Sequence, residues 1–246
     1  MGKIEGIFAE TYDRFIKRKS LLPEGLLELV RSLKPDSILE FGCGTGNVAV
    51  GLALEGFNIT GIDFSSDMLR VAAGKAKEHG ASPKFILGDI TKVRLNRQFD
   101  LIICLGNTLP ILTTVRKLES TLLNCRNHLK PAGGVVIFQQ LNYDRVLKEK
   151  PVTFSIDFDK ELVRFKQYHY RKNLIDFVVT IVDGSRIPPR ASVSKIALRP
   201  WTSRQLKAAL KRAGFQDIRF YGNYARGDFS INSKDLIIIA AAGGKK

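Results

Sequence analysis

The stretch ILEFGCGTGNVAVGLA, from Ile38 to Ala53, constrains the fold more than any other part of this 246-residue chain. A short apolar run leads into a loop with glycine at every second position, and the loop leads into a helical segment. Glycines this close together cost chain entropy, so the backbone there must need a conformation or a contact that a Cβ atom would prevent. A strand, a glycine-rich turn and a helix in this order predict a ligand held against bare backbone.

Short apolar runs alternate with amphipathic stretches up to about residue 144. The runs SILEF, NITGI, KFILG and FDLIICL are typical of buried parallel strands, and helices are expected over 65–80 and 113–134. PVTFSIDF, ELVRFKQYHY and LIDFVVTIV then alternate apolar with polar residues, which indicates antiparallel strands with one solvated face. A helix and two strands follow. The pattern predicts a doubly wound α/β sheet with an inserted antiparallel β subdomain.

Four parts are expected along the chain: an N-terminal helical cap (1–35), a cofactor-binding core (36–146), the inserted β subdomain (147–200), and a helix with a strand pair that completes the core (201–246). No apolar run reaches the roughly 18 residues of a membrane span, and the N-terminus does not resemble a signal peptide. The three cysteines are scattered, which favours reduced thiols in a cytoplasmic protein. No metal site is predicted.

The formal net charge is +15, and residues 144–226 contribute 18 Lys and Arg against 8 Asp and Glu, or +10. A basic half of this kind is compatible with a phosphate-bearing or acidic partner. The charges are dispersed rather than clustered, which favours a solvated surface.

Acidic residues are expected at the carboxyl ends of three neighbouring strands: Glu40, Asp63 and Asp89. Such ends converge on one crevice in an open α/β sheet. An acid after the second strand suits a ribose diol. Because dinucleotides and adenosine-type cofactors both contain a ribose, this feature does not distinguish between them. Three carboxylates are a poor environment for a pyrophosphate and a good one for a cation. They favour S-adenosylmethionine, which carries sulfonium and ammonium charges.

The motifs EFGCGTG, GIDFSSDML, GDI and FDLIICLGNTL, in this order, resemble those of class I S-adenosylmethionine-dependent methyltransferases. LKRAGFQDIRFYGNY and SKDLIIIAAA resemble the final helix and strand pair of that family. Within it, ICLGNT and NYDRVL are most similar to glycine N-methyltransferase and related small-molecule N-methyltransferases. The resemblance implies a Rossmann-like seven-stranded sheet whose last strand is antiparallel.

The resemblance also implies the cofactor residues. They are Tyr12 and Arg31 for the methionyl carboxylate, Gly42, Gly44 and Gly46 for the loop, Glu40 beside it, Asp63 for the ribose, Met68 with Asp89 and Ile90 for adenine, and Leu105 near the methionine portion.

Asn107 is expected beside the methyl-transfer position, again by resemblance. The inserted strands are predicted to cover the crevice and select the acceptor, with Tyr168 or Tyr170 holding it. The chain departs from the subgroup where Leu198 and Arg199 replace an expected tyrosine, which leaves glycine in doubt as acceptor.

The expected reaction is transfer of a methyl group to the nitrogen of a small amine or amino acid. The alternatives are a nucleic-acid methyltransferase, suggested by the basic half, a non-catalytic S-adenosylmethionine binder, and a dehydrogenase. The fourth strand ends in LGNTLP, without the Asn/Asp-Pro-Pro-aromatic tetrapeptide of base methyltransferases. A monomer and a homo-oligomer are equally compatible with the sequence.

Overall fold

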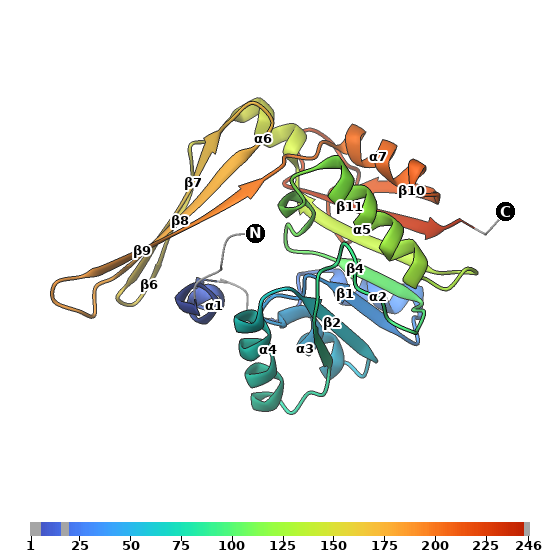
Figure 1. Ribbon diagram of the computed structural model, residues 1–246, viewed down its shortest axis with the longest axis horizontal. Helices are drawn as coiled ribbons and strands as arrows, with labels where there is room; N and C mark the ends of the chain where they lie inside the picture. The colour runs from blue at the N-terminus through green and yellow to red at the C-terminus, as the bar shows by residue number, and fades with distance from the viewer. Residues whose placement is uncertain (1–5, 16–19, 244–246) are drawn as a thin grey trace.

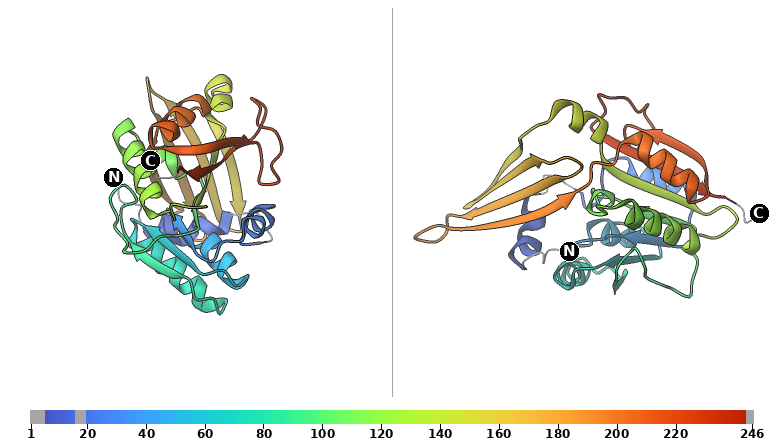
Figure 2. Two further views of the ribbon diagram at one scale, coloured as in Figure 1. Left: turned by 90° about the vertical axis from the view of Figure 1, so that its right-hand side faces the viewer. Right: turned by 45° about the horizontal axis from the view of Figure 1, so that its top comes forward.

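The computed structural model describes residues 6–15 and 20–243 (Figure 1). One mixed sheet has the strand order β10-β11-β5-β4-β1-β2-β3, and a second sheet has the order β6-β7-β8-β9. The second sheet projects from one side of the α/β core, as Figure 1 and the right-hand view of Figure 2 both show.

Parallel pairing joins β3, β2, β1, β4 and β5, and β11 runs antiparallel to both β5 and β10. Every residue of β1, β2 and β4 is buried, because helices cover both faces of a parallel sheet. The strands of this sheet are β1 (Ile38–Phe41), β2 (Ile59–Asp63), β3 (Lys84–Leu87), β4 (Leu101–Cys104), β5 (Val135–Leu141), β10 (Phe215–Tyr221) and β11 (Asp235–Ala242).

Local capping explains where several helices begin. The side chains of Ser65, Thr114 and Asn142 each accept a backbone N–H in the first turn of α4, α5 and α6, and Thr202 forms a capping box with Gln205 in α7. The helices are α1 (Gly6–Tyr12), α2 (Leu26–Leu33), α3 (Asn47–Leu54), α4 (Ser66–Glu78), α5 (Val115–His128), α6 (Tyr143–Glu149) and α7 (Ser203–Arg212), with short 3₁₀ turns at Asp13–Phe15 and Leu109–Ile111.

Two apolar layers hold the core together. Side chains of α5 and α7, including Leu118, Leu122 and Leu206, pack with residues of β4, β5 and β11 on one face of the sheet. Side chains of α2 and α3, including Leu26 and Leu52, pack on the other face. All three cysteines are free and buried, and burial raises the pKa of each thiol. They are core side chains, as the sequence predicts.

The inserted sheet has one strand more than the sequence indicates. Its strands are β6 (Thr153–Asp159), β7 (Leu162–Tyr170), β8 (Ile175–Asp183) and β9 (Arg190–Leu198), each antiparallel to the next. β9 was not predicted because its large apolar residues, Val193, Ile196 and Leu198, do not keep a period of two. The expected boundary at 146–147 falls inside α6.

The predicted fold class is confirmed: a Rossmann-like seven-stranded sheet with one antiparallel strand, and a separate antiparallel β subdomain. Across residues 6–15 and 20–243, we find no helix with the length and apolarity to cross a membrane.

Candidate functional site

A cavity of about 520 Å³ lies at the carboxyl edge of the seven-stranded sheet. The loops after β1, β2, β3 and β4 form one side of it, and Tyr12 of α1 contributes from the N-terminal segment. The inserted sheet contributes Phe177, Ile196 and Leu198. The strand topology brings these segments together, since parallel strands end at one edge. The volume is typical of a small-molecule site.

The three glycines of the loop after β1 have positive φ angles, and they are required for two different reasons. A Cβ on Gly42 would lie 2.5 Å from the Thr108 side chain, and one on Gly46 would lie 2.8 Å from the Ala72 Cβ of α4. A Cβ on Gly44 would meet nothing within 4 Å, and Gly44 lines the cavity. Gly42 and Gly46 therefore permit packing, whereas Gly44 keeps backbone open toward a ligand.

Replacing Gly44 with alanine is expected to weaken binding of S-adenosylmethionine, the cofactor that the sequence resemblance implies, at least tenfold, because the new Cβ would occupy open space beside the cavity. The φ of +53° adds about 1 kcal/mol of strain. Gly56→Ala is the matched control, since Gly56 also has a positive φ and open space around it but does not line the cavity. Titration calorimetry and melting curves of both variants measure the two effects. Equal cofactor affinity in the two would contradict the assignment of Gly44.

Glu40, at the end of β1, is an unusual acid for a folded protein. It lines the cavity and is almost completely buried, and its Oε2 atom has no hydrogen-bond partner among the described residues. Burial, with a smaller effect of nearby Asp63, raises the pKa of Glu40 from an ordinary 4.5 to about 8. A cation bound in the cavity would restore its charged form.

Asp63, at the end of β2, holds the glycine loop in place. Its Oδ2 accepts the N–H of Gly44 at 2.9 Å, and its Oδ1 accepts the N–H of Ser65 at 2.9 Å. Burial raises the pKa of Asp63, and the backbone hydrogen bonds oppose that shift. Asp89, after β3, lines the same cavity and accepts the N–H of Thr91 at 2.9 Å. The three predicted acids thus border one cavity.

These features fit S-adenosylmethionine. Glu40 offers an unpartnered carboxylate oxygen to a cation, and Gly44 leaves a cradle that a Cβ would fill. Met68, Ile90 and Leu105 supply buried apolar surface along the same cavity, and Tyr12 and Asp89 line it as well.

Arg31, which was predicted to bind the cofactor's carboxylate, does not line the cavity. It is on α2 beside the buried Leu29 and Val30, its side chain is 57% exposed, and its Nη2 pairs with Oε2 of Glu55 at 2.5 Å. The structure does not bring it to the cavity. Lys75 of α4, which the sequence analysis did not single out, contacts the glycine loop: its Nζ pairs with Asp13 Oδ2 at 2.5 Å and donates to the Thr45 carbonyl at 2.9 Å.

Asn107 follows β4 with a φ of +69° and lines the cavity. Its Oδ1 accepts the N–H of Leu141 at 3.1 Å, and its Nδ2 donates to the Tyr143 hydroxyl at 2.8 Å. Tyr143 is in turn hydrogen-bonded to Tyr168. The Asn107 side chain is therefore fixed by a buried chain of polar groups.

Tyr168 and Tyr170 lie outside the cavity lining. Burial raises the pKa of Tyr168 to about 12, while the hydrogen bond with Tyr143 opposes the shift. The Tyr170 hydroxyl donates to the Pro151 carbonyl at 3.0 Å. Tyr168 is connected to the cavity residue Asn107 by its hydrogen bond with Tyr143. Tyr170 is hydrogen-bonded to the segment before β6.

Four further lining residues were not predicted from the sequence: Gln139, Tyr224, Lys234 and Asp235. Tyr224 comes from the loop between β10 and β11. Leu198 lines the cavity, but Arg199 does not, because its guanidinium stacks 4.4 Å from the Trp201 ring. Gln139 is in β5, Lys234 directly precedes β11 and Asp235 begins it, and no local motif marks these three residues.

Comparison with known proteins agrees with this geometry. The family model described as "Methyltransferase domain" matches residues 38–133. A ubiquinone biosynthesis O-methyltransferase of Rickettsia canadensis (strain McKiel) is 33% identical over 105 residues, which are 43% of this chain and 42% of that protein. A glycine/sarcosine N-methyltransferase of Aphanothece halophytica is 26% identical over 231 residues, covering 90% of this chain and 82% of that one.

The fold is also that of a solved structure. An S-adenosylmethionine-dependent methyltransferase from Clostridium acetobutylicum ATCC 824 superposes with a TM-score of 0.83 at 22% identity, over 97% of this chain and 98% of that one. The chain spans less than half the length of the ubiquinone O-methyltransferases that it matches. The match to the N-methyltransferase extends through the inserted sheet. Residues 38–133 match the methyltransferase domain family, and over most of its length the chain is similar in sequence to the glycine/sarcosine N-methyltransferase and has the fold of the S-adenosylmethionine-dependent methyltransferase.

Proposed function

We propose that this protein transfers the methyl group of S-adenosylmethionine to a nitrogen of a small molecule. One observation carries the proposal: a single cavity extends from the glycine loop to the inserted sheet and is bordered by four carboxylates, those of Glu40, Asp63, Asp89 and Asp235. Among the described lining residues, Lys234 is the one Lys or Arg. Such a cavity suits a cationic cofactor and an amine, which is a cation at neutral pH.

The chemistry requires little beyond alignment and exclusion of water. S-adenosylmethionine supplies a methyl group on a sulfonium, whose departure leaves a neutral thioether. Glu40 and Asp63 would hold the cofactor's charged and ribose portions, and Asn107 would border the acceptor. Phe177, Ile196 and Leu198 of the inserted sheet give the acceptor half an apolar wall that excludes water.

The basic half of the chain does not favour a nucleic acid. Some of its cations pair with acids, among them Arg164 with Asp157 at 2.8 Å and Lys195 with Asp176 at 2.8 Å. Phosphate contacts need cations near the site, and residues 144–226 contribute no Lys or Arg to the described cavity lining.

Methyl transfer with labelled cofactor tests the proposal. Amines, amino acids, catechols and tRNA are offered in parallel at about 150 mM salt. We expect label on amine nitrogen and none on tRNA. Transfer to a catechol oxygen would contradict the nitrogen assignment. Transfer to tRNA, with affinity that falls steeply as salt rises, would favour the nucleic-acid alternative.

We retain Asn107 as a residue that contacts the acceptor and assign Tyr168 an indirect, positioning role. Tyr143→Phe and Tyr168→Phe are expected to lower kcat about tenfold, since each removes one buried hydrogen bond from the chain that fixes Asn107. Cofactor affinity should change less than twofold. Tyr170→Phe should leave kcat unchanged, because that hydroxyl bonds to Pro151. Equal kcat in all three variants would contradict this arrangement.

A further inference from the structure

Asp235 lies at the start of β11, opposite Leu141 of β5 in the sheet register. It lines the same cavity as Asp63 and Asp89, but β11 is separated from β2 in the sheet by β5, β4 and β1. Leu141 donates its N–H to Asn107, so β5 has Asp235 on one side and Asn107 on the other. Asp235 is therefore on the same side of the cavity as Asn107, where the proposed function places the acceptor.

A chain of two hydrogen bonds sets the orientation of the Asp235 carboxylate. The backbone N–H of Gly106 donates to Oε1 of Gln139 at 2.7 Å. Because the amide oxygen of Gln139 is used there, its amide nitrogen faces the other way and donates to Oδ1 of Asp235 at 3.0 Å. Within the described part of the chain, the side-chain hydrogen bonds of Asp235 involve Oδ1, which leaves Oδ2 available to a ligand.

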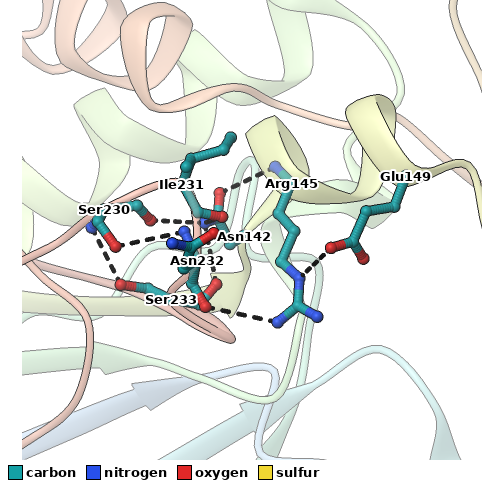
Figure 3. A network of polar contacts seen from close by, with 7 residues as sticks. All are labelled: Asn142, Arg145, Glu149, Ser230, Ile231, Asn232 and Ser233. Atoms are coloured by element: carbon teal, nitrogen blue, oxygen red, sulfur yellow. Dashed lines mark hydrogen bonds and ion pairs between the residues drawn. The ribbon is translucent and has the colours of Figure 1, made fainter.

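The loop that precedes Asp235 is anchored rather than loose (Figure 3). Asn142 Nδ2 donates to the carbonyls of Ser230 and Ser233, each at 3.0 Å, and the Asn142 N–H donates to the Lys234 carbonyl at 3.0 Å. Arg145, which ion-pairs with Glu149 in the same helix, reaches the loop at Asn232. The backbone on both sides of the carboxylate is thus fixed before any acceptor binds.

The surroundings of Asp235 favour proton uptake. Burial raises its pKa, and the Gln139 hydrogen bond and the nearby Lys234 ammonium oppose the shift. Three other titratable residues line the cavity on these elements. They are Lys234 directly before Asp235, Tyr224 in the loop before β11, and Glu40 in β1. A carboxylate with a raised pKa is a better base toward an ammonium than an exposed one.

We propose that Asp235 binds the ammonium group of the acceptor and removes the proton that must leave before methyl transfer. The inference rests on the proposed N-methylation. The Asp235 carboxylate takes one proton from R–NH₃⁺, giving R–NH₂ and a neutral carboxyl group. The nitrogen lone pair forms the new C–N bond as the methyl–sulfur bond breaks, and the electron pair of that bond stays on sulfur. The product is R–NH₂CH₃⁺, and Asp235 releases its proton to solvent. Gln139 is a positioning residue that acts through Asp235.

The test measures kcat/KM from pH 6.5 to 10 with labelled S-adenosylmethionine and an amine panel of glycine, sarcosine, ethanolamine and glucosamine. Asp235→Asn should lower kcat/KM about 100-fold at pH 7.5, in the range of general-base effects. The deficit should shrink to within tenfold at pH 10, where more of the amine is already neutral. Asp235→Glu should recover part of the activity. Gln139→Leu should shift the pH profile of kcat/KM to higher pH, because the charged form of Asp235 loses a hydrogen bond.

Asp228→Asn is the matched control, an exposed aspartate in the same loop that does not line the cavity. Cofactor affinity and melting temperature, measured for every variant, report folding separately from chemistry. An Asp235→Asn variant with the rate and pH profile of Asp228→Asn would overturn the role of Asp235 alone. A wild-type protein that binds cofactor but methylates no amine would overturn the proposed function and this inference with it.

Discussion

Replacing Glu40 with glutamine is expected to weaken S-adenosylmethionine binding by about 100-fold while making the unliganded protein more stable at alkaline pH. The loss of affinity follows from removing the buried carboxylate whose Oε2 has no partner among the described residues. A hydrogen bond to a charged group contributes about 1.5–3 kcal/mol. Calorimetry with S-adenosylmethionine measures the first effect, and denaturant unfolding across pH measures the second.

The sign of the stability effect follows from the pKa of Glu40, which is about 8 in the folded protein against an ordinary 4.5. Between these values the folded state holds a proton that the unfolded state has lost. The free energy of unfolding therefore falls as pH rises from about 4.5 to about 8, by on the order of a few kcal/mol, and then levels off. The glutamine variant lacks this contribution, so it should exceed the wild type in stability above pH 8.

The same titration makes cofactor binding depend on pH. At pH 7 the wild-type Glu40 is largely protonated, and a bound cation favours its charged form, so binding releases a proton. Affinity should rise between about pH 6 and 8 in the wild type and stay flat in Glu40→Gln. Glu55→Gln is the matched control, because Glu55 is a surface residue paired with Arg31. Parallel affinity profiles in Glu40→Gln and Glu55→Gln would contradict a cofactor role for Glu40.

Replacing Asp63 with alanine is expected to reduce cofactor affinity at least 100-fold and methyl transfer with it. The carboxylate has two tasks: it lines the cavity, where we propose that it binds the ribose, and it accepts the N–H groups of Gly44 and Ser65. Its removal leaves two backbone donors without their partner and releases the loop. Asp63→Asn should be nearly as damaging, because an amide nitrogen would face one of those N–H groups.

Asp67→Asn provides the comparison for Asp63, since Asp67 lies in the first turn of α4 and does not line the cavity. It should bind cofactor within threefold of the wild type. The measurements are the dissociation constant and the initial rate with labelled cofactor. An Asp63→Ala variant that kept both values would refute the proposed role of this carboxylate.

The part of the site built from local pattern could be predicted from the sequence. The glycine loop follows a strand whose four residues are all buried. Glu40 and Asp63 lie in the last two residues of β1 and β2, and Asp89 lies two residues after β3. Parallel strands place such residues at one edge of the sheet, whatever conformation the connecting loops adopt. The prediction of a cavity bordered by these acids therefore depended on topology, which the alternation of strands and helices indicates.

Residues whose position depends on a helix face or on distant strand pairing could not be predicted in this way. Arg31 follows the buried Val30 directly on α2, so its side chain points to the surface, where Glu55 is available. Gln139 and Asp235 are 96 positions apart and meet through the pairing of β5 with β11. Period-two patterning says which face a residue occupies but not which partner it meets.

The central claim is that the cavity between the glycine loop and the inserted sheet binds S-adenosylmethionine. Isothermal titration of the purified protein with this compound and with its demethylated product tests it most directly. We predict saturable heat with both ligands at one site per chain, stronger at pH 8 than at pH 6 and at least tenfold weaker in Gly44→Ala. No heat with either ligand, or equal binding by wild type and Gly44→Ala, would contradict the account.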